Sequence, residues 1–326
     1  MPKKALNILK YICAVLLTAV LVYLAIRGID WDTFADAFLQ TKWVFVGMSL
    51  ACAFAALVFR MERWRLLMIK INPEIQRRTL WDACNIGNLV SLGVPWVSFL
   101  VRCGVVTDKK TSYDKTLGTF LMERAWDFLM VFLLIALALI LNSKEISDWF
   151  IDNIALKAAG RFNFGVIGVL SALCIIVVLS IVLVYKLKTK NGAAAKISSW
   201  LDGIFEGFKT FKKVEKKIPF VLYTIFIWTS YFLMCWFIFK AIPALSHLGI
   251  NDAIFISAVG NLSSLLPVPG GFGSFHYFVA LALSSVYGVS WEIGILFATL
   301  IHETRSLMLV ALGAVSMIST QKKIKL

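Results

Sequence analysis

Charged residues are scarce in this sequence. They make up 16% of its 326 residues, whereas hydrophobic residues make up 60%. The mean hydropathy is +0.81, and soluble domains carry about 25% charged and about 45–50% apolar residues. This composition leaves little room for a soluble domain and predicts a polytopic membrane protein.

Paired cysteines and metal or nucleotide motifs are also missing. The six cysteines are scattered without a CxxC pair, so we expect small buried side chains and neither a disulfide framework nor a metal site. The chain has no zinc-finger or P-loop spacing. Its net charge of +14 would suit nucleic acid, but in so apolar a chain the enrichment of Lys and Arg in cytoplasmic loops explains it better. We therefore expect no cofactor and no nucleic-acid partner.

Runs of about 20 apolar residues mark the expected membrane spans. The first follows a basic start and has no small-x-small cleavage pattern, so we expect a retained helix and not a signal peptide. Two further segments, 81–101 and 252–287, are apolar but interrupted by glycine and proline. The six full spans expected are 5–26, 44–59, 116–141, 164–185, 218–239 and 293–318.

The distribution of basic residues fixes the expected topology. If each interrupted segment enters and leaves the membrane on one side, the inner loops hold 25 of the 33 Lys and Arg residues and the outer loops hold 6. If only the first segment crossed the membrane, this asymmetry would be lost. The positive-inside rule therefore predicts that both termini are cytoplasmic.

The most unusual stretch is 260–273, GNLSSLLPVPGGFG, which carries two prolines and four glycines inside a hydrophobic run. Proline removes a backbone donor and glycine loosens a helix. Backbone groups freed at membrane depth must be buried in protein or line a cavity. The stretch thus predicts a broken or re-entrant helix on a substrate path, with its own glycines facing the ligand.

An internal repeat accompanies this break. Residues 87–92, GNLVSL, match residues 260–265, GNLSSL, at five of six positions. Each copy leads to proline and then to a helix that bears an acid and an arginine: Pro95, Glu123 and Arg124 in the first, and Pro267, Pro269, Glu303 and Arg305 in the second. In the expected topology the copies are inverted relative to the membrane, which is typical of secondary transporters.

These patterns predict the fold class. We expect an all-α, polytopic membrane helix bundle with two inverted repeats, each containing a re-entrant or broken helix. One domain would cover 1–326, with repeat 1 at about 44–141 and repeat 2 at about 218–318.

Five charged residues fall within hydrophobic stretches. Glu123 and Asp127 are four residues apart and share a helix face with each other, and Arg124 lies between them. Glu303 and Arg305 sit near the middle of the last span. A charge at this depth costs about 2.5 kcal/mol or more unless it is paired or hydrated, so all five are functional candidates. The alternatives are a helix cap for Glu123 and Asp127 and a structural ion pair for Glu303 and Arg305.

The amides and histidines of the repeats are weaker candidates. Asn88 and Asn261 need hydrogen-bond partners at membrane depth; supporting the broken helices is favoured over facing a headgroup. His276 follows the GGFG turn, and His302 precedes Glu303. A metal site would require the histidines to converge on Glu303, which the sequence does not favour, and no Ser/His/Asp spacing predicts hydrolysis.

Two basic segments have apolar residues at helical spacing. They are 196–217, and 60–78 with Met61, Trp64 and Leu67. Such amphipathic helices lie on an anionic inner-leaflet surface. The alternative is that both are loops whose charge only sets the topology.

Several of these motifs together resemble the lysylphosphatidylglycerol synthase transmembrane-region family, a flippase-like domain also found as a stand-alone protein. The resemblance runs from about residue 5 to residue 317. It rests on PVPGGFG at 267–273, on Glu123-Arg124 followed by Asp127, and on Arg305. The segment around Asn88 and Pro95 is similar as well.

Two positions depart from the family pattern. Trp96-Val97-Ser98 follow the first proline, where the family commonly has an arginine and then Gly-Glu, and His276 stands where a glutamate is common. The family's aminoacyl-transferring unit is a separate soluble domain, for which this chain has no room, so we expect no enzyme activity.

The resemblance implies a lipid translocase or lipid-binding transporter for anionic phospholipid or polyprenyl-linked lipid in a bacterial-type inner membrane. Its partners would be membrane lipids, with a homodimer or a partner enzyme left open. The alternatives are a membrane-embedded lipid-modifying enzyme, which would lack an Asp-rich metal motif here, and a scaffold for a partner enzyme. We expect substrate binding by Asn88, Pro95, Glu123, Arg124, Asp127, Asn261, Pro269, Gly270, Gly271, Gly273, His276, Glu303 and Arg305.

Overall fold

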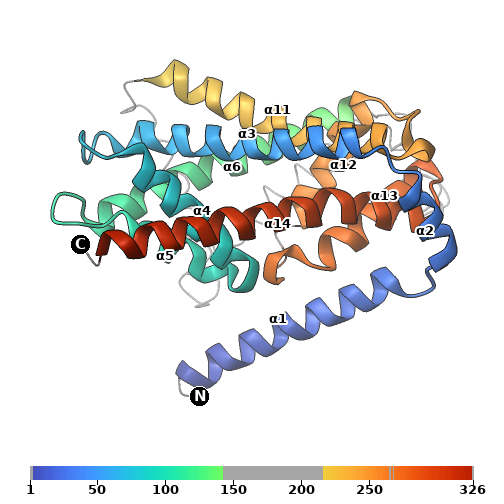
Figure 1. Ribbon diagram of the computed structural model, residues 1–326, viewed down its shortest axis with the longest axis horizontal. Helices are drawn as coiled ribbons and strands as arrows, with labels where there is room; N and C mark the ends of the chain where they lie inside the picture. The colour runs from blue at the N-terminus through green and yellow to red at the C-terminus, as the bar shows by residue number, and fades with distance from the viewer. Residues whose placement is uncertain (1–2, 142–215, 264–265, 267, 325–326) are drawn as a thin grey trace, which may run out of the picture.

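The computed structural model describes residues 3–141, 216–263, 266 and 268–324, and this part is helical throughout, without strands (Figure 1). The all-α prediction is confirmed. The α-helices are α1 Lys3–Ile26, α2 Trp31–Leu39, α3 Trp43–Met68, α4 Arg77–Gly93, α5 Pro95–Val105, α6 Tyr113–Leu141, α11 Lys217–Ala241, α12 Ile250–Ser263, α13 Ser274–Tyr287 and α14 Trp291–Ile324. Two 3-10 turns, Pro243–Leu245 (η2) and Pro269–Gly271 (η3), complete the described part.

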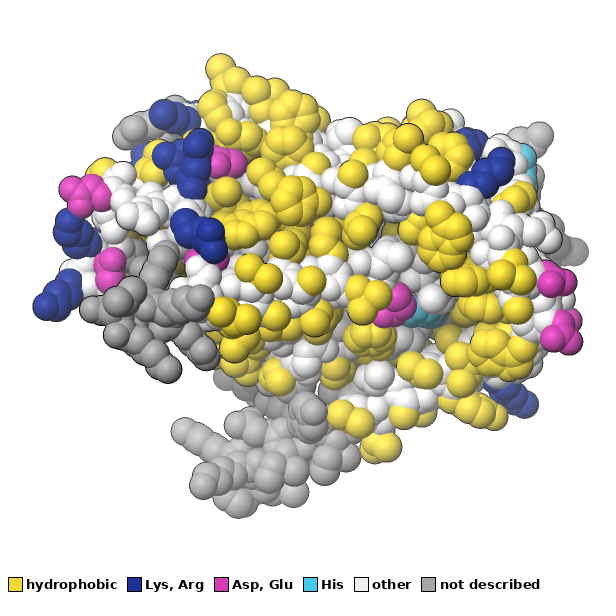
Figure 2. All heavy atoms as spheres, viewed as in Figure 1, with side chains coloured by type: hydrophobic (Ala, Val, Ile, Leu, Met, Phe, Trp, Pro, Cys, Tyr) yellow, Lys and Arg dark blue, Asp and Glu magenta, His cyan; other side chains and the backbone are white. Residues whose placement is uncertain are grey.

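Three described helices are long and apolar enough to cross a membrane: Trp43–Met68, Lys217–Ala241 and Trp291–Thr320. They correspond to three of the six expected spans. The spans expected at 5–26 and 116–141 form α1 and α6, and the one at 164–185 lies outside the described residues. Figure 2 shows hydrophobic side chains over the middle of one face and most charged side chains toward its two ends, as expected of a membrane protein.

The first interrupted segment forms two helices that pack against each other, α4 and α5. The helix breaks at Val94, whose φ of −135° and ψ of 80° are not helical, and Pro95 begins α5. Proline is tolerated there because the first helical N–H has no partner inside the helix. A Cβ on Gly87 would lie 2.9 Å from the Arg102 Cβ, so the glycine permits the close approach of the two helices.

The second interrupted segment forms α12 and α13, joined through the PGGFG turn. Gly270, Gly271 and Gly273 have φ values of 61°, 77° and 79°, a region that side-chain-bearing residues rarely adopt. A Cβ on Gly270 would lie 3.1 Å from the carbonyl oxygen of Leu92 in α4. The tips of the two helix pairs therefore meet, while the pairs extend toward opposite ends of the bundle (Figure 1). The inverted-repeat relationship itself stays a prediction.

The interfacial interpretation of 60–78 is wrong. Helix α3 continues through this segment to Met68, and Met61, Trp64 and Leu67 are buried in a hydrophobic cluster with α4 and α6. The side chains that suggested a membrane-surface helix instead pack in the bundle. The other basic segment, 196–217, lies almost entirely outside the described residues.

Gly273 packs closely against α1, and substitution of this glycine tests the contact. A Cβ there would lie 2.7 Å from the backbone nitrogen of Val22. We expect Gly273→Ala to destabilise the protein by about 1–3 kcal/mol, because the residue would combine positive φ with a backbone clash. Thermal unfolding in detergent measures this. Gly47→Ala in α3, where a Cβ meets nothing within 4 Å, is the control; equal stability of both variants would contradict the contact.

Candidate functional site

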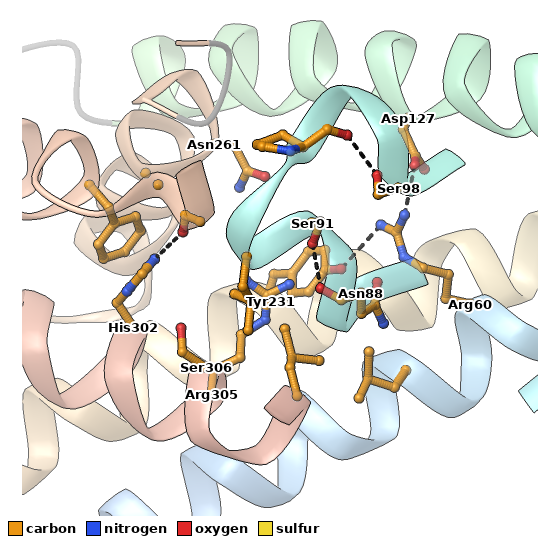
Figure 3. A pocket seen from close by; sticks show the side chains of 18 of the residues that line it. Arg60, Asn88, Ser91, Ser98, Asp127, Tyr231, Asn261, His302, Arg305 and Ser306 are labelled. Carbon is orange, nitrogen blue, oxygen red and sulfur yellow. Dashed lines mark hydrogen bonds and ion pairs between the residues drawn. The ribbon is translucent and has the colours of Figure 1, made fainter. Parts of the chain in front are cut away.

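A cavity of about 520 Å³ lies between the two broken helices and the long helices α3, α6, α11 and α14. Figure 3 shows its polar wall, to which elements far apart in the sequence contribute side chains. Apolar side chains, including Leu57, Phe99, Val131 and Ile301, form much of the rest. A partly apolar cavity with a few convergent polar groups is typical of small-ligand sites. The labelled polar residues are Arg60, Asn88, Ser91, Ser98, Asp127, Tyr231, Asn261, His302, Arg305 and Ser306.

Buried ion pairs join α3, α5 and α6 beside this cavity. The Nη2 of Arg63 lies 2.6 Å from Asp127 Oδ1 and 3.3 Å from Glu123 Oε1. The Nη2 of Arg102 lies 2.9 Å from Glu123 Oε2, and the Nη1 of Arg60 lies 3.1 Å from Asp127 Oδ2. The side chains of Arg63 and Glu123 are fully buried. These pairs fix three helices relative to one another, because an unpaired charge in a buried position is costly.

The cavity wall carries more positive than negative charge. Its described lining contains four arginines, Arg60, Arg102, Arg124 and Arg305, and one carboxylate, Asp127. The buried pair of Arg63 and Glu123 lies behind the wall and has no net charge, so counting it leaves the excess of positive charge unchanged. The chemistry of this wall suits an anion, because guanidinium groups form strong charge-assisted hydrogen bonds with phosphate and carboxylate oxygens.

Arg305 makes no ion pair or hydrogen bond with any other described residue. Its guanidinium carbon lies 6.0 Å from the centre of the Tyr231 ring, and the Tyr231 hydroxyl accepts a hydrogen bond of 3.1 Å from Arg60 Nη2. Tyr231 thus lies between the two arginines (Figure 3). The donors of Arg305 are left available to a ligand.

Arg124 is the most accessible of the remaining arginines, with 44% of its side chain exposed. Its guanidinium carbon lies 4.8 Å from the centre of the Phe120 ring. Its Nη1 lies 3.8 Å from Asp127 Oδ2.

The helix-cap interpretation of Glu123 and Asp127 is wrong, because α6 begins at Tyr113, ten residues before Glu123.

A second polar cluster lies where the PGG turn meets α13 and α14. Nδ1 of His302 lies 2.8 Å from Glu303 Oε1, and Nε2 of His276 lies 3.4 Å from the same oxygen. Nε2 of His302 lies 2.9 Å from the Gly270 carbonyl oxygen. The structure thus brings two of the three histidines to Glu303, whereas His247 is exposed in the turn before α12.

The structure places eight of the thirteen expected site residues on the cavity wall. They are Asn88, Pro95, Arg124, Asp127, Asn261, Gly270, Gly271 and Arg305. The other five are elsewhere: Glu123 is buried behind the wall, Gly273 contacts α1, Pro269 is outside the lining, and His276 and Glu303 belong to the second cluster. Asn261 also supports its own helix, since its Nδ2 donates to the Ser257 carbonyl oxygen at 2.8 Å.

Sequence reasoning missed Arg60, Arg102 and Tyr231, and considered His302 only as a member of a disfavoured metal site. Arg60 was assigned to a cytoplasmic loop because the hydrophobic run ends there. A signal was nevertheless present: Arg60 and Arg63 share a helix face by their spacing, as do Glu123 and Asp127. Two such faces of opposite charge predict that their helices pair. Tyr231 carries no comparable signal.

The membrane-length apolar helices, the broken segments and the arginine-lined cavity define a helical membrane protein with a candidate ligand site between its helices. The family model described as lysylphosphatidylglycerol synthase TM region matches residues 11–313. The chain therefore belongs to this family, whose membership implies a lipid-related function in the membrane. No curated protein and no solved structure matched the chain.

Proposed function

We propose that the protein is a flippase-like translocase, or a lipid-binding transporter, for anionic phospholipid or polyprenyl-linked lipid. The observation that carries this proposal is the positive excess of the cavity wall, four arginines against one aspartate. A headgroup without net negative charge would leave all of that excess unbalanced in a low-dielectric site, whereas an anionic phosphodiester headgroup offsets part of it.

The broken helices supply the rest of the site. The Gly270 and Gly271 backbone lines the cavity where two helix pairs of opposite direction meet. Apolar walls beside this polar centre suit acyl or prenyl chains, and the arginines suit the headgroup. Alternating access at such a meeting point is a general property of transporters with broken helices.

The test is reconstitution of the purified protein in liposomes with labelled lipids. We expect labelled anionic phospholipid to exchange between leaflets at least about tenfold faster than labelled zwitterionic lipid, because the arginines repel the amine of a zwitterionic headgroup and so offset about one charge-assisted contact of about 1.5–3 kcal/mol. Chromatography of the same lipids checks for chemistry. A new lipid species would favour a lipid-modifying enzyme, and equal rates for both headgroups would contradict the assigned role of the arginines.

A further inference from the structure

The cluster of His276, His302 and Glu303 extends from the cavity wall to the outside of the bundle. His302 and Gly270 line the cavity, and the Glu303 side chain is 32% exposed. Figure 2 shows an acidic and a histidine side chain together in the middle of an otherwise hydrophobic face. Titratable groups in such a position are expensive, which makes them functional candidates.

The hydrogen bonds of this cluster require a dissociable proton. The Gly270 carbonyl can only accept, so the Nε2 of His302, 2.9 Å away, carries a hydrogen. In a neutral ring, Nδ1 is then a bare acceptor that faces Glu303 Oε1 at 2.8 Å. Two acceptors do not bind each other. One proton must therefore sit between them, either on the carboxyl group or on an imidazolium ring.

A second acceptor position for this proton lies beside the first. The His276 Nε2 lies 3.4 Å from the same Glu303 oxygen. The surrounding elements add no other ion pair within the described residues: α13 contributes His276, α14 contributes Glu303, and η3 contributes the Gly270 carbonyl. The proton can thus pass from Glu303 Oε1 to either ring, with one O–H bond broken and one N–H bond formed.

The cavity-facing ring is held in place by aromatic contacts. The His302 ring centre lies 5.2 Å from the ring centres of both Phe272 and Phe275. A negative headgroup in the cavity and a proton bound at this cluster would attract each other, because opposite charges interact strongly in a low-dielectric site. Headgroup binding and proton binding are then linked.

We propose that His302, Glu303 and His276 form a proton-binding site that couples lipid translocation to the movement of protons in the same direction. This inference rests on the proposed function. It assigns an energy source to the same cavity and accounts for titratable groups that the headgroup contacts leave unused.

The experiment uses proteoliposomes with labelled phosphatidylglycerol, an imposed pH gradient, and the membrane potential held at zero with potassium and an ionophore. With one proton per lipid, a gradient of one pH unit should enrich the label up to about tenfold in the leaflet facing the alkaline side. Glu303→Gln, His302→Gln and His276→Gln should each reduce this enrichment to about onefold. His247→Gln and Glu292→Gln, which change a histidine and a carboxylate outside the cluster, should retain it.

The other outcomes separate the two proposals. Lipid movement in wild type that ignores gradients of either sign would overturn the coupling and leave the translocase standing. No movement beyond protein-free vesicles would overturn both. Full enrichment in all three cluster variants would remove these residues from the coupling. Wild-type protein that carries a stoichiometric transition metal, lost in the variants, would also overturn the assignment of a proton to this position.

Discussion

Glu123→Gln is expected to destabilise the protein by about 3–5 kcal/mol, a typical cost of breaking a buried ion pair by removing one partner. Glu123 is fully buried and lies within 3.3 Å of a guanidinium nitrogen on both Arg63 and Arg102. Glutamine keeps the shape and removes the charge that holds α3, α5 and α6 together. Thermal unfolding of the purified protein, with yield after size exclusion, measures the loss.

The matched control is Glu74→Gln. Glu74 also pairs with a cation, Lys110, but both side chains are mostly exposed. Exposed pairs contribute about 0–1 kcal/mol, so this variant should unfold near the wild-type temperature. If Glu123→Gln were as stable as Glu74→Gln, the buried pairs would not stabilise the bundle.

Arg305→Ala is expected to slow the movement of anionic lipid by about tenfold to a hundredfold, with little change in yield. The loss corresponds to one charge-assisted contact of about 1.5–3 kcal/mol. The yield should hold because Arg305 pairs with no described residue, and its nearest described aromatic contact is the Tyr231 ring at 6.0 Å. The leaflet-exchange assay with labelled anionic lipid provides the rate.

Two variants sharpen this test. Arg305→Lys keeps the charge but loses the planar donors, so an intermediate rate is expected. Arg27→Ala removes an exposed arginine just after α1, whose guanidinium carbon lies 5.9 Å from the centre of the Tyr23 ring, and should leave the rate unchanged. A wild-type rate in Arg305→Ala would exclude this residue from headgroup binding.

The helical class and both helix breaks could be predicted from the sequence because their causes are local. Proline at 95 cannot continue a helix, and glycine at 270, 271 and 273 permits the positive φ that the turn requires. Composition and the run lengths of apolar residues were sufficient for the membrane class. None of these inferences required knowledge of which helices are neighbours.

The site was predicted only in part because its missing members depend on tertiary packing. Arg60 and Arg63 appeared cytoplasmic until α6 supplied Glu123 and Asp127 as partners. Gly273 was expected to face a ligand, yet α1 occupies that space. Local sequence specifies the shape of the backbone. The helix that fills the space beside that backbone lies more than 50 residues away in the sequence, so local sequence does not identify it.

The contact between Leu92 and Gly270 has an electrical consequence. At about 1.5 Å per residue, α4 and α12 measure about 26 Å and 21 Å, each shorter than a hydrocarbon core of about 30 Å. In a membrane, a polar cavity beside these two tips would thin the insulating layer, and the transmembrane voltage would then fall over a short distance. A headgroup with one net negative charge that crosses this layer without a compensating proton would gain or lose about 2.3 kcal/mol per 100 mV. Cotransport with one proton would make the same step electrically neutral.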